Sequence, residues 1–136
     1  MKKKVLIPLD GSNRDLISLN FLKENFDSKD TEVLLLNVGD IVYSHGIVVS
    51  HLISMEEEKA VRTLERAYEL LKDYDCTKEF QFGYVDKTIV ECSIDYEIDI
   101  IIMTKDARKI YIPFMGSVNC KVVKKAKCIV IVLPQV

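Results

Sequence analysis

The stretch that decides the fold is Lys4-Val5-Leu6-Ile7-Pro8-Leu9-Asp10-Gly11-Ser12. Apolar residues run almost without interruption from Val5 to Leu9, which is typical of a strand covered on both faces, and such strands usually lie in parallel sheets. The turn cluster that begins at Asp10 can cap a helix. Large apolar residues then recur at helical spacing as far as Phe26. A strand, a turn and a helix in this order predict the first unit of an α/β fold.

The same alternation of strands and helices continues to the end of the chain. Further strands are predicted at 32–38, 79–84, 98–103 and 128–133, and further helices at 55–74, 87–96 and 117–125. Residues 39–52 are expected to form a loop with a short extended piece. Because the 79–84 segment alternates polar and apolar residues, it is placed nearer the sheet edge. We therefore predict an α/β protein with a five-stranded parallel sheet, flanked by helices on both faces, in a single domain over 1–136.

Apolar spacing within the helices predicts which residues face the sheet. The residues expected on these buried stripes include Leu16, Val61, Tyr68, Ile94, Val118, Val122 and Val123. Asp86 is expected to cap the helix over 87–96.

Composition excludes several classes of protein. The 136 residues include 19 basic and 21 acidic ones, for a net charge of −2, which creates no field to attract nucleic acid. The apolar runs are far shorter than the roughly 20 residues that span a membrane. The apolar segment after Met1 is also too short for a signal peptide. We expect a cytoplasmic protein with neither a nucleic-acid nor a membrane partner.

The cysteines and histidines indicate neither a metal site nor catalysis. The four cysteines form no C-x-x-C pair, which is typical of buried or half-buried thiols in a reducing compartment. The two histidines, His45 and His51, lack recognisable partner ligands. No Ser-His-Asp, Cys-His or paired-carboxylate arrangement is recognisable. We therefore expect no metal and no enzymatic activity.

Candidate site residues lie where predicted strands end, because ligands of such sheets bind beyond the carboxyl ends of the strands. Asp10 ends the first strand, and its carboxylate can accept hydrogen bonds from a ribose or an adenine edge, or can simply cap the turn. Gly116 and Ser117 open the last helix, whose N-terminus suits a phosphate. Ser117 can equally serve only as the N-cap, with Gly116 providing the turn.

Five segments together resemble the universal stress protein family, and they follow in the family's order along nearly the whole chain. They are Lys4–Ser12, Leu35–Val38, Asp99–Met103, Met115–Val118 and Cys128–Pro134. The resemblance implies a Rossmann-like (adenine nucleotide alpha hydrolase-like) fold and a homodimer whose last strands pair across a two-fold axis. Members of the family divide into nucleotide binders and non-binders, and the ligand implied for a binder is ATP or another adenine nucleotide. The positions that match the nucleotide site of family members are Asp10, Val38, Met103, Gly116, Ser117 and Val118.

The phosphate loop departs from the family's nucleotide-binding pattern, which is Gly, two residues, Gly, nine residues, then Gly-Ser or Gly-Thr. The final pair is present as Gly116-Ser117, but the first glycine falls on Met103 or Thr104 and the second on Asp106 or Ala107. A Cβ at these positions crowds the backbone path of a phosphate, and the Asp106 carboxylate repels it. We therefore expect a non-catalytic regulatory or protective stress protein with a degenerate nucleotide site. The alternative is a stress protein that binds ATP in the same crevice despite the missing glycines.

Two other classes share this broad fold. A receiver-like phosphoacceptor domain would find an acid at Asp10 and a hydroxyl at Thr104, but the third strand ends without an aspartate and the fifth without a lysine. A nucleotidyl transferase resembles a pattern with paired histidines after the first strand, whereas His45 follows the second. Phosphorylation by acetyl phosphate would support the first class, and turnover of ATP the second.

Overall fold

The computed structural model describes residues 1–39, 43–44, 47–48, 50–105 and 117–135. Five parallel strands form the main sheet: β1 (Lys3–Leu9), β2 (Thr31–Gly39), β5 (Asp75–Phe82), β6 (Ile100–Thr104) and β7 (Ile129–Leu133). The strand order is β5-β2-β1-β6-β7. The helices are α1 (Arg14–Asn25), α2 (Ser50–Leu70), α3 (Val85–Asp95) and α4 (Val118–Lys125), with a short 3₁₀ turn at Ser28–Asp30. The predicted Rossmann-like α/β fold is confirmed.

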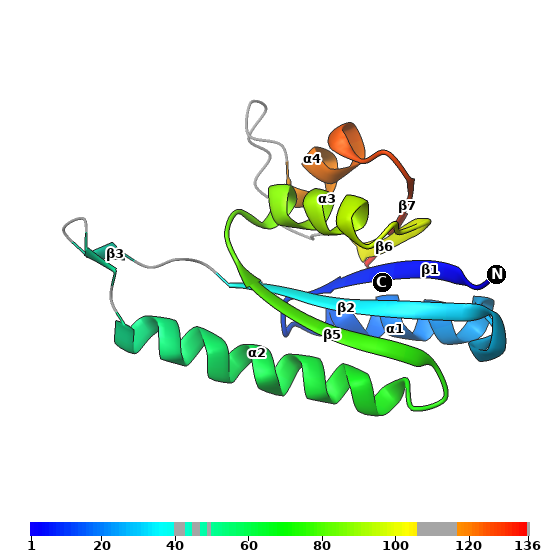
Figure 1. The fold of residues 1–136 in the computed structure, drawn as a ribbon, viewed down its shortest axis with the longest axis horizontal. Helices are drawn as coiled ribbons and strands as arrows, with labels where there is room; N and C mark the ends of the chain where they lie inside the picture. The colour runs from blue at the N-terminus through cyan, green and yellow to red at the C-terminus, as the bar shows by residue number, and fades with distance from the viewer. Residues whose placement is uncertain (40–42, 45–46, 49, 106–116, 136) are drawn as a thin grey trace.

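The short extended piece expected between the second strand and the second helix is an antiparallel pair, β3 (Tyr43–Ser44) and β4 (Ile47–Val48). It stands apart from the main sheet (Figure 1). Within the described ranges, no helix is long and apolar enough to cross a membrane.

The central strand β1 explains the continuous apolar run with which the fold begins. It pairs with β2 from Lys3 opposite Thr31 to Leu9 opposite Asn37, and with β6 on its other side. Successive side chains of a strand point to opposite faces, and both faces are covered here. Val5, Leu6 and Ile7 are accordingly all fully buried.

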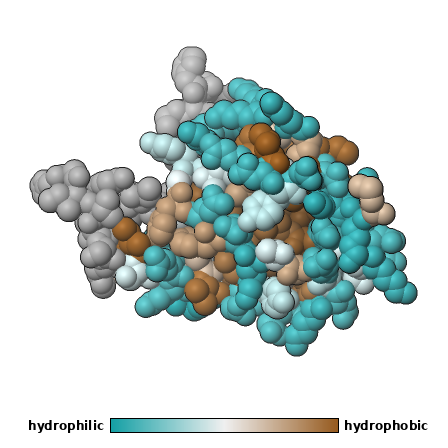
Figure 2. Space-filling model, in the orientation of Figure 1, coloured by the Kyte–Doolittle hydropathy of each residue, from teal (hydrophilic) through white to brown (hydrophobic). Residues whose placement is uncertain are grey.

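Helices cover both faces of the sheet, with α1 and α2 on one side and α3 and α4 on the other (Figure 1). On the first side, Val5 and Ile7 pack with Leu19, Leu22, Leu64 and other apolar residues. On the second side, Leu6, Leu34 and Leu36 pack with Ile89, Cys92 and Val122. The alternation of β1 thus divides the interior into two cores. On the face shown in Figure 2, hydrophilic side chains predominate around the rim and apolar side chains show between them toward the centre.

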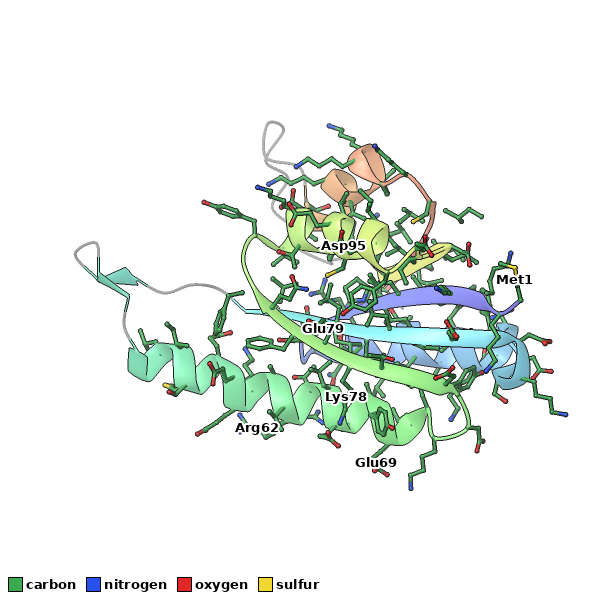
Figure 3. The ribbon with its side chains drawn as sticks, viewed as in Figure 1. Met1, Arg62, Glu69, Lys78, Glu79 and Asp95 are labelled. Carbon is green, nitrogen blue, oxygen red and sulfur yellow. The ribbon has the colours of Figure 1, made fainter. Side chains whose placement is uncertain are left out.

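The strand with alternating residues lies at the sheet edge, as predicted. On β5, Lys78 contacts Glu65 and stacks over the Tyr68 ring at 4.5 Å, on the α2 side. The neighbouring Glu79 accepts a hydrogen bond of 2.9 Å from the Tyr96 hydroxyl, on the α3 side (Figure 3). These two consecutive charged residues therefore contact helices on opposite faces of the sheet.

Several predicted element starts are wrong by a few residues. The second helix begins at Ser50 rather than 55, and β5 begins at Asp75 rather than 79. Asp86 does not cap α3, because that helix begins at Val85 with Tyr84 as its N-cap. The Asp86 carboxylate instead accepts a hydrogen bond of 2.9 Å from Lys125 of α4.

The predicted buried stripes are too wide. Only Val122 of the three valines in α4 is fully buried. The predicted inward residues that prove exposed are Leu16, Val61, Tyr68, Ile94, Val118 and Val123. A helix on a sheet is covered along one narrow line of contact, so apolar residues at the stripe margins remain in solvent. Apolar identity alone does not distinguish the margin from the centre.

Candidate functional site

A cleft lies where the strand order reverses between β1 and β6. Chain connections run from β1 to β2 on one side and later return to β6 on the other, which opens a crevice at the carboxyl ends of the strands. The cleft has a volume of about 440 Å³, within the range of small-molecule sites. A smaller hollow of about 160 Å³ lies at the opposite end of the sheet, beside Lys4 and Glu32.

The turn after β1 holds the first predicted site residue, Asp10. One of its oxygens accepts a hydrogen bond of 2.9 Å from the Ser12 backbone N–H, and the other forms an ion pair with the Arg14 guanidinium. Gly11 between them has φ of +84°, a conformation that favours glycine. Partial burial alone would raise the pKa of Asp10, but the hydrogen bonds from Ser12 and the charge of Arg14 lower it overall. The carboxylate at the cleft rim is therefore ionised at neutral pH.

A second carboxylate, Asp15, stands behind the first. Its two oxygens accept hydrogen bonds from the backbone N–H groups of Asp10, at 3.1 Å, and Gly11, at 2.8 Å. Burial raises the pKa of Asp15 to about 6, and the neighbouring negative charge of Asp10 acts in the same direction. Asp15 was not predicted from the sequence as a site residue. Its signal is the Ser12-x-x-Asp15 spacing of a capping box, although the carboxylate reaches further back than that motif requires.

Buried hydroxyls form the β6 end of the cleft. Thr104 ends β6, and its hydroxyl oxygen lies 2.8 Å from that of Ser18 in α1. The Asn119 side chain of α4 donates a hydrogen bond of 3.5 Å to the Thr104 carbonyl. Thr104, one of the two positions on which the first glycine of the family pattern falls, thus holds a side chain that is buried and hydrogen-bonded to helix α1.

The β2 end of the cleft is fixed by Asn37, whose side-chain amide donates a hydrogen bond of 2.8 Å to the Leu9 carbonyl. Its neighbour Val38 lines the cleft. Gly39 follows in close contact with the edge strand, since a Cβ there would lie 2.8 Å from the Phe80 ring. These contacts hold the ends of β1, β2 and β5 together at the rim.

Four of the predicted site residues line the same cleft, namely Asp10, Val38, Met103 and Val118. Ser117 does not line it; its hydroxyl accepts a hydrogen bond of 3.3 Å from the Cys120 backbone N–H as the N-cap of α4. Gly116 lies outside the described residues, as do Asp106 and Ala107. The polar cleft residues that the sequence analysis missed are Arg14, Asp15, Ser18, Asn37, Glu56, Lys59 and Asn119.

Most of these missed residues are brought in by helices. Arg14, Asp15 and Ser18 share one face of α1, because positions three and four apart are neighbours on a helix. Glu56 and Lys59 of α2 line the cleft in the same way. Helical residues near a strand end become visible as site candidates only when the packing angle of the helix is known.

Comparisons with known proteins agree with this architecture. The family model described as "Universal stress protein family" matches residues 1–134. A comparison with curated proteins finds no match for this chain. Among solved structures, the hypothetical protein MJ0577, whose biochemical function was assigned from its structure, is 28% identical with a TM-score of 0.76. That likeness covers 100% of this chain and 98% of the other.

Two other similar structures contain nucleotides. A universal stress protein in complex with cAMP is 14% identical with a TM-score of 0.77, over 99% of this chain and 98% of that one. A universal stress protein family protein from Arabidopsis thaliana with AMP bound is 16% identical with a TM-score of 0.71, over 98% of this chain and 92% of that one. At these identities the likeness concerns the fold. Because the family model matches nearly every residue, the chain belongs to the universal stress protein family.

Proposed function

We propose that this protein binds an adenine nucleotide in the cleft and acts as a non-catalytic regulatory protein in the response to stress. The observation that carries the proposal is the meeting of Asp10, Val38, Met103 and Val118 around one cleft of about 440 Å³. These residues come from three strand ends and one helix start, and the family resemblance associates the same positions with a nucleotide. The relatives with bound cAMP and AMP support this choice of ligand.

The lining of the cleft suits the two parts of an adenosine group. Val38, Val85 and Met103 offer apolar surface to a purine base. The Asp10 carboxylate has about half of its side-chain surface exposed, so it can accept hydrogen bonds from ribose hydroxyls at the rim. Charged acceptors form stronger hydrogen bonds than neutral ones, and a ribose there would therefore gain affinity and orientation.

A binding role without catalysis fits the bonding of the polar groups. Catalysis by a serine or threonine requires an adjacent base, but the Ser18 and Thr104 hydroxyls bond to one another. Both oxygens of Asp15 already accept backbone hydrogen bonds. The hydroxyls of Ser18 and Thr104 and the carboxylate of Asp15 are thus engaged in holding the site.

We also propose that two copies associate through β7 in the cytoplasm. This strand is at the sheet edge, and Ile129 and Val132 on it are 62% and 38% exposed. An unpaired apolar edge favours pairing with another strand. The four cysteines are free thiols, in keeping with a reducing compartment. Light scattering at micromolar concentration should give the mass of a dimer, and a monomer mass would reject this part of the proposal.

Nucleotide binding can be tested in two steps. Protein purified from cells is denatured and the supernatant is analysed for adenine nucleotides by chromatography, and the emptied and refolded protein is titrated calorimetrically with AMP and cAMP. Asp10→Asn should weaken binding by about tenfold, since it removes a charged acceptor. The matched control Asp30→Asn, at an exposed position in the 3₁₀ turn, should leave binding unchanged. The absence of released nucleotide and of binding heat would overturn the proposal.

A further inference from the structure

We infer that Arg14, together with the Ser18–Thr104 hydroxyl pair, provides the phosphate-binding group of this cleft and restricts it to adenine nucleotides with a single phosphate. The inference rests on the proposed function and specifies its ligand. This chain lacks the glycines that precede Gly116 in the family's phosphate loop. In our proposal, side chains of α1 and β6 bind the phosphate in place of that loop.

Arg14 is held at the cleft in a defined orientation. Its Nε donates a hydrogen bond of 3.3 Å to the Ser12 hydroxyl, and its Nη2 contacts the Asp10 carboxylate. Only 25% of its side-chain surface is exposed. A guanidinium is permanently charged, and its planar fork matches a phosphate in two parallel hydrogen bonds. Because Asp10 fixes the position of this fork beforehand, a ligand phosphate would lose little side-chain entropy on meeting it.

The hydroxyl pair has one proton more than its mutual hydrogen bond uses. Each hydroxyl carries one proton, and the contact of 2.8 Å between Ser18 and Thr104 consumes one of the two. Among the described residues, neither hydroxyl has a second side-chain partner, and both residues line the cleft while being more than nine-tenths buried. Ser18 lies four positions after Arg14 and so projects from the same face of α1. The second proton can therefore be donated to an anionic oxygen that Arg14 also binds.

The charge of the lining opposes a longer phosphate chain. Among the described residues around the cleft, the carboxylates are Asp10, Asp15 and Glu56, and the cations are Arg14 and Lys59. The Arg14 guanidinium can bind one phosphate while it keeps its contact with Asp10, whereas each further phosphate adds negative charge to a lining in which acids outnumber bases. Thr104 also has a side chain where close approach of a phosphate to the backbone would favour glycine. Both effects select a monophosphate or a cyclic monophosphate over a triphosphate.

The selectivity for one phosphate is tested with the full-length protein after any bound nucleotide has been removed by denaturation and refolding. This protein is titrated with adenosine, AMP, cAMP and ATP at one pH and one ionic strength. AMP should bind about 10- to 100-fold more tightly than adenosine, because its phosphate gains hydrogen bonds to a charged group. ATP should bind more weakly than AMP. ATP binding as tight as AMP binding, or adenosine binding as tight as AMP binding, would overturn the inference.

The residues are tested by substitutions compared on AMP and on adenosine. Arg14→Ala should lose about 10- to 100-fold in AMP affinity while adenosine affinity changes little, and Arg14→Lys should be intermediate because it keeps the charge without the fork. The double variant Ser18→Ala/Thr104→Val should lose about threefold to tenfold for AMP only. The matched control Arg62→Ala changes an exposed arginine of α2 (Figure 3), away from the cleft lining, and should behave as the parent.

One further variant separates two reasons for an effect at Arg14. Removing Arg14 also leaves the Asp10 carboxylate unpaired, and that charge would itself repel a phosphate. If this repulsion were the whole effect, Asp10→Asn/Arg14→Ala would recover the AMP preference over adenosine, and the inference would be wrong. If adenosine and all nucleotides fail to bind the parent chain, the proposed function itself fails. If adenosine binds and the phosphate adds nothing, only the present inference fails.

Discussion

The two ends of the cleft are built in different ways. Where β1 ends, the hydrogen bonds of Asp10, Ser12 and Asp15 join residues two to five positions apart. Where β6 ends, the Ser18–Thr104 bond joins residues 86 positions apart, and Lys105 N–H bonds to the Leu133 carbonyl at 2.7 Å. The β1 end is thus a local turn that its own sequence can form. The β6 end exists only when α1, β6 and β7 have assembled.

The largest change in the free energy of unfolding is expected from a substitution in the core beneath the β6 end of the cleft. Ile101 is fully buried at the centre of β6, so Ile101→Ala should lower the free energy of unfolding by about 2–5 kcal/mol. Urea denaturation followed by circular dichroism measures the change. The control Ile94→Ala, at a position 51% exposed, should cost about 0.5 kcal/mol or less. Equal losses in the two variants would contradict the distinction between buried and exposed apolar residues.

A double-mutant cycle should show that the β6 end is cooperative. Ser18→Ala and Thr104→Val each leave a buried hydroxyl without its partner, and each should cost about 1–3 kcal/mol in free energy of unfolding. The double variant should cost clearly less than the sum, because neither unpaired hydroxyl remains. Thr77→Val on the exposed surface of β5 is the matched control and should change little. Additive losses would mean that the two hydroxyls do not act as a pair.

The same contrast explains how far the sequence could predict the structure. The run from Val5 to Leu9 predicts a central strand, because a strand that is buried on both faces requires apolar residues at nearly every position. Asp10 could be placed at the cleft because a residue that ends a central strand has little choice of position. Ser18 could not be placed at the cleft, because the sequence around a serine in a helix is the same whether its hydroxyl faces solvent or contacts Thr104. The exposed Val118 and Val123 show the same limit, because helical spacing does not reveal how much of a helix the sheet covers.

The β1 end should respond to pH through Asp15. The pKa of Asp15 is raised from 3.8 to about 6 in the folded protein, so the folded state holds a proton that the unfolded state releases first. The stabilisation from this group is complete below pH 3.8 and is lost as the pH rises through about 6. Relative to Asp15→Asn, which does not titrate, the parent chain should therefore lose about 1 kcal/mol between pH 4 and pH 7.

Two measurements check this prediction. Urea denaturation of both proteins across that pH range gives the difference in free energy of unfolding, and carbon-detected NMR gives the titration of the Asp15 carboxyl carbon itself. The Asp10 carboxyl, whose pKa is lowered, serves as the internal reference and should titrate below 3.8. A midpoint of Asp15 near 4, or a stability difference that does not vary with pH, would contradict the burial of this carboxylate.

The smallest effect is expected from a contact that is distant in sequence but open to solvent. Lys125 of α4 bonds to Asp86 of α3 across 39 positions, and the Lys125 side chain is 55% exposed. Lys125→Met should lower the free energy of unfolding by about 0.5 kcal/mol or less, and 1 M salt should remove the difference, because water and ions screen such a pair. A loss as large as that from Ser18→Ala would mean that sequence separation, rather than burial, determines how much a tertiary contact contributes. We expect the opposite, since the Ser18–Thr104 bond is shielded from water at the cleft floor and the Lys125–Asp86 bond is not.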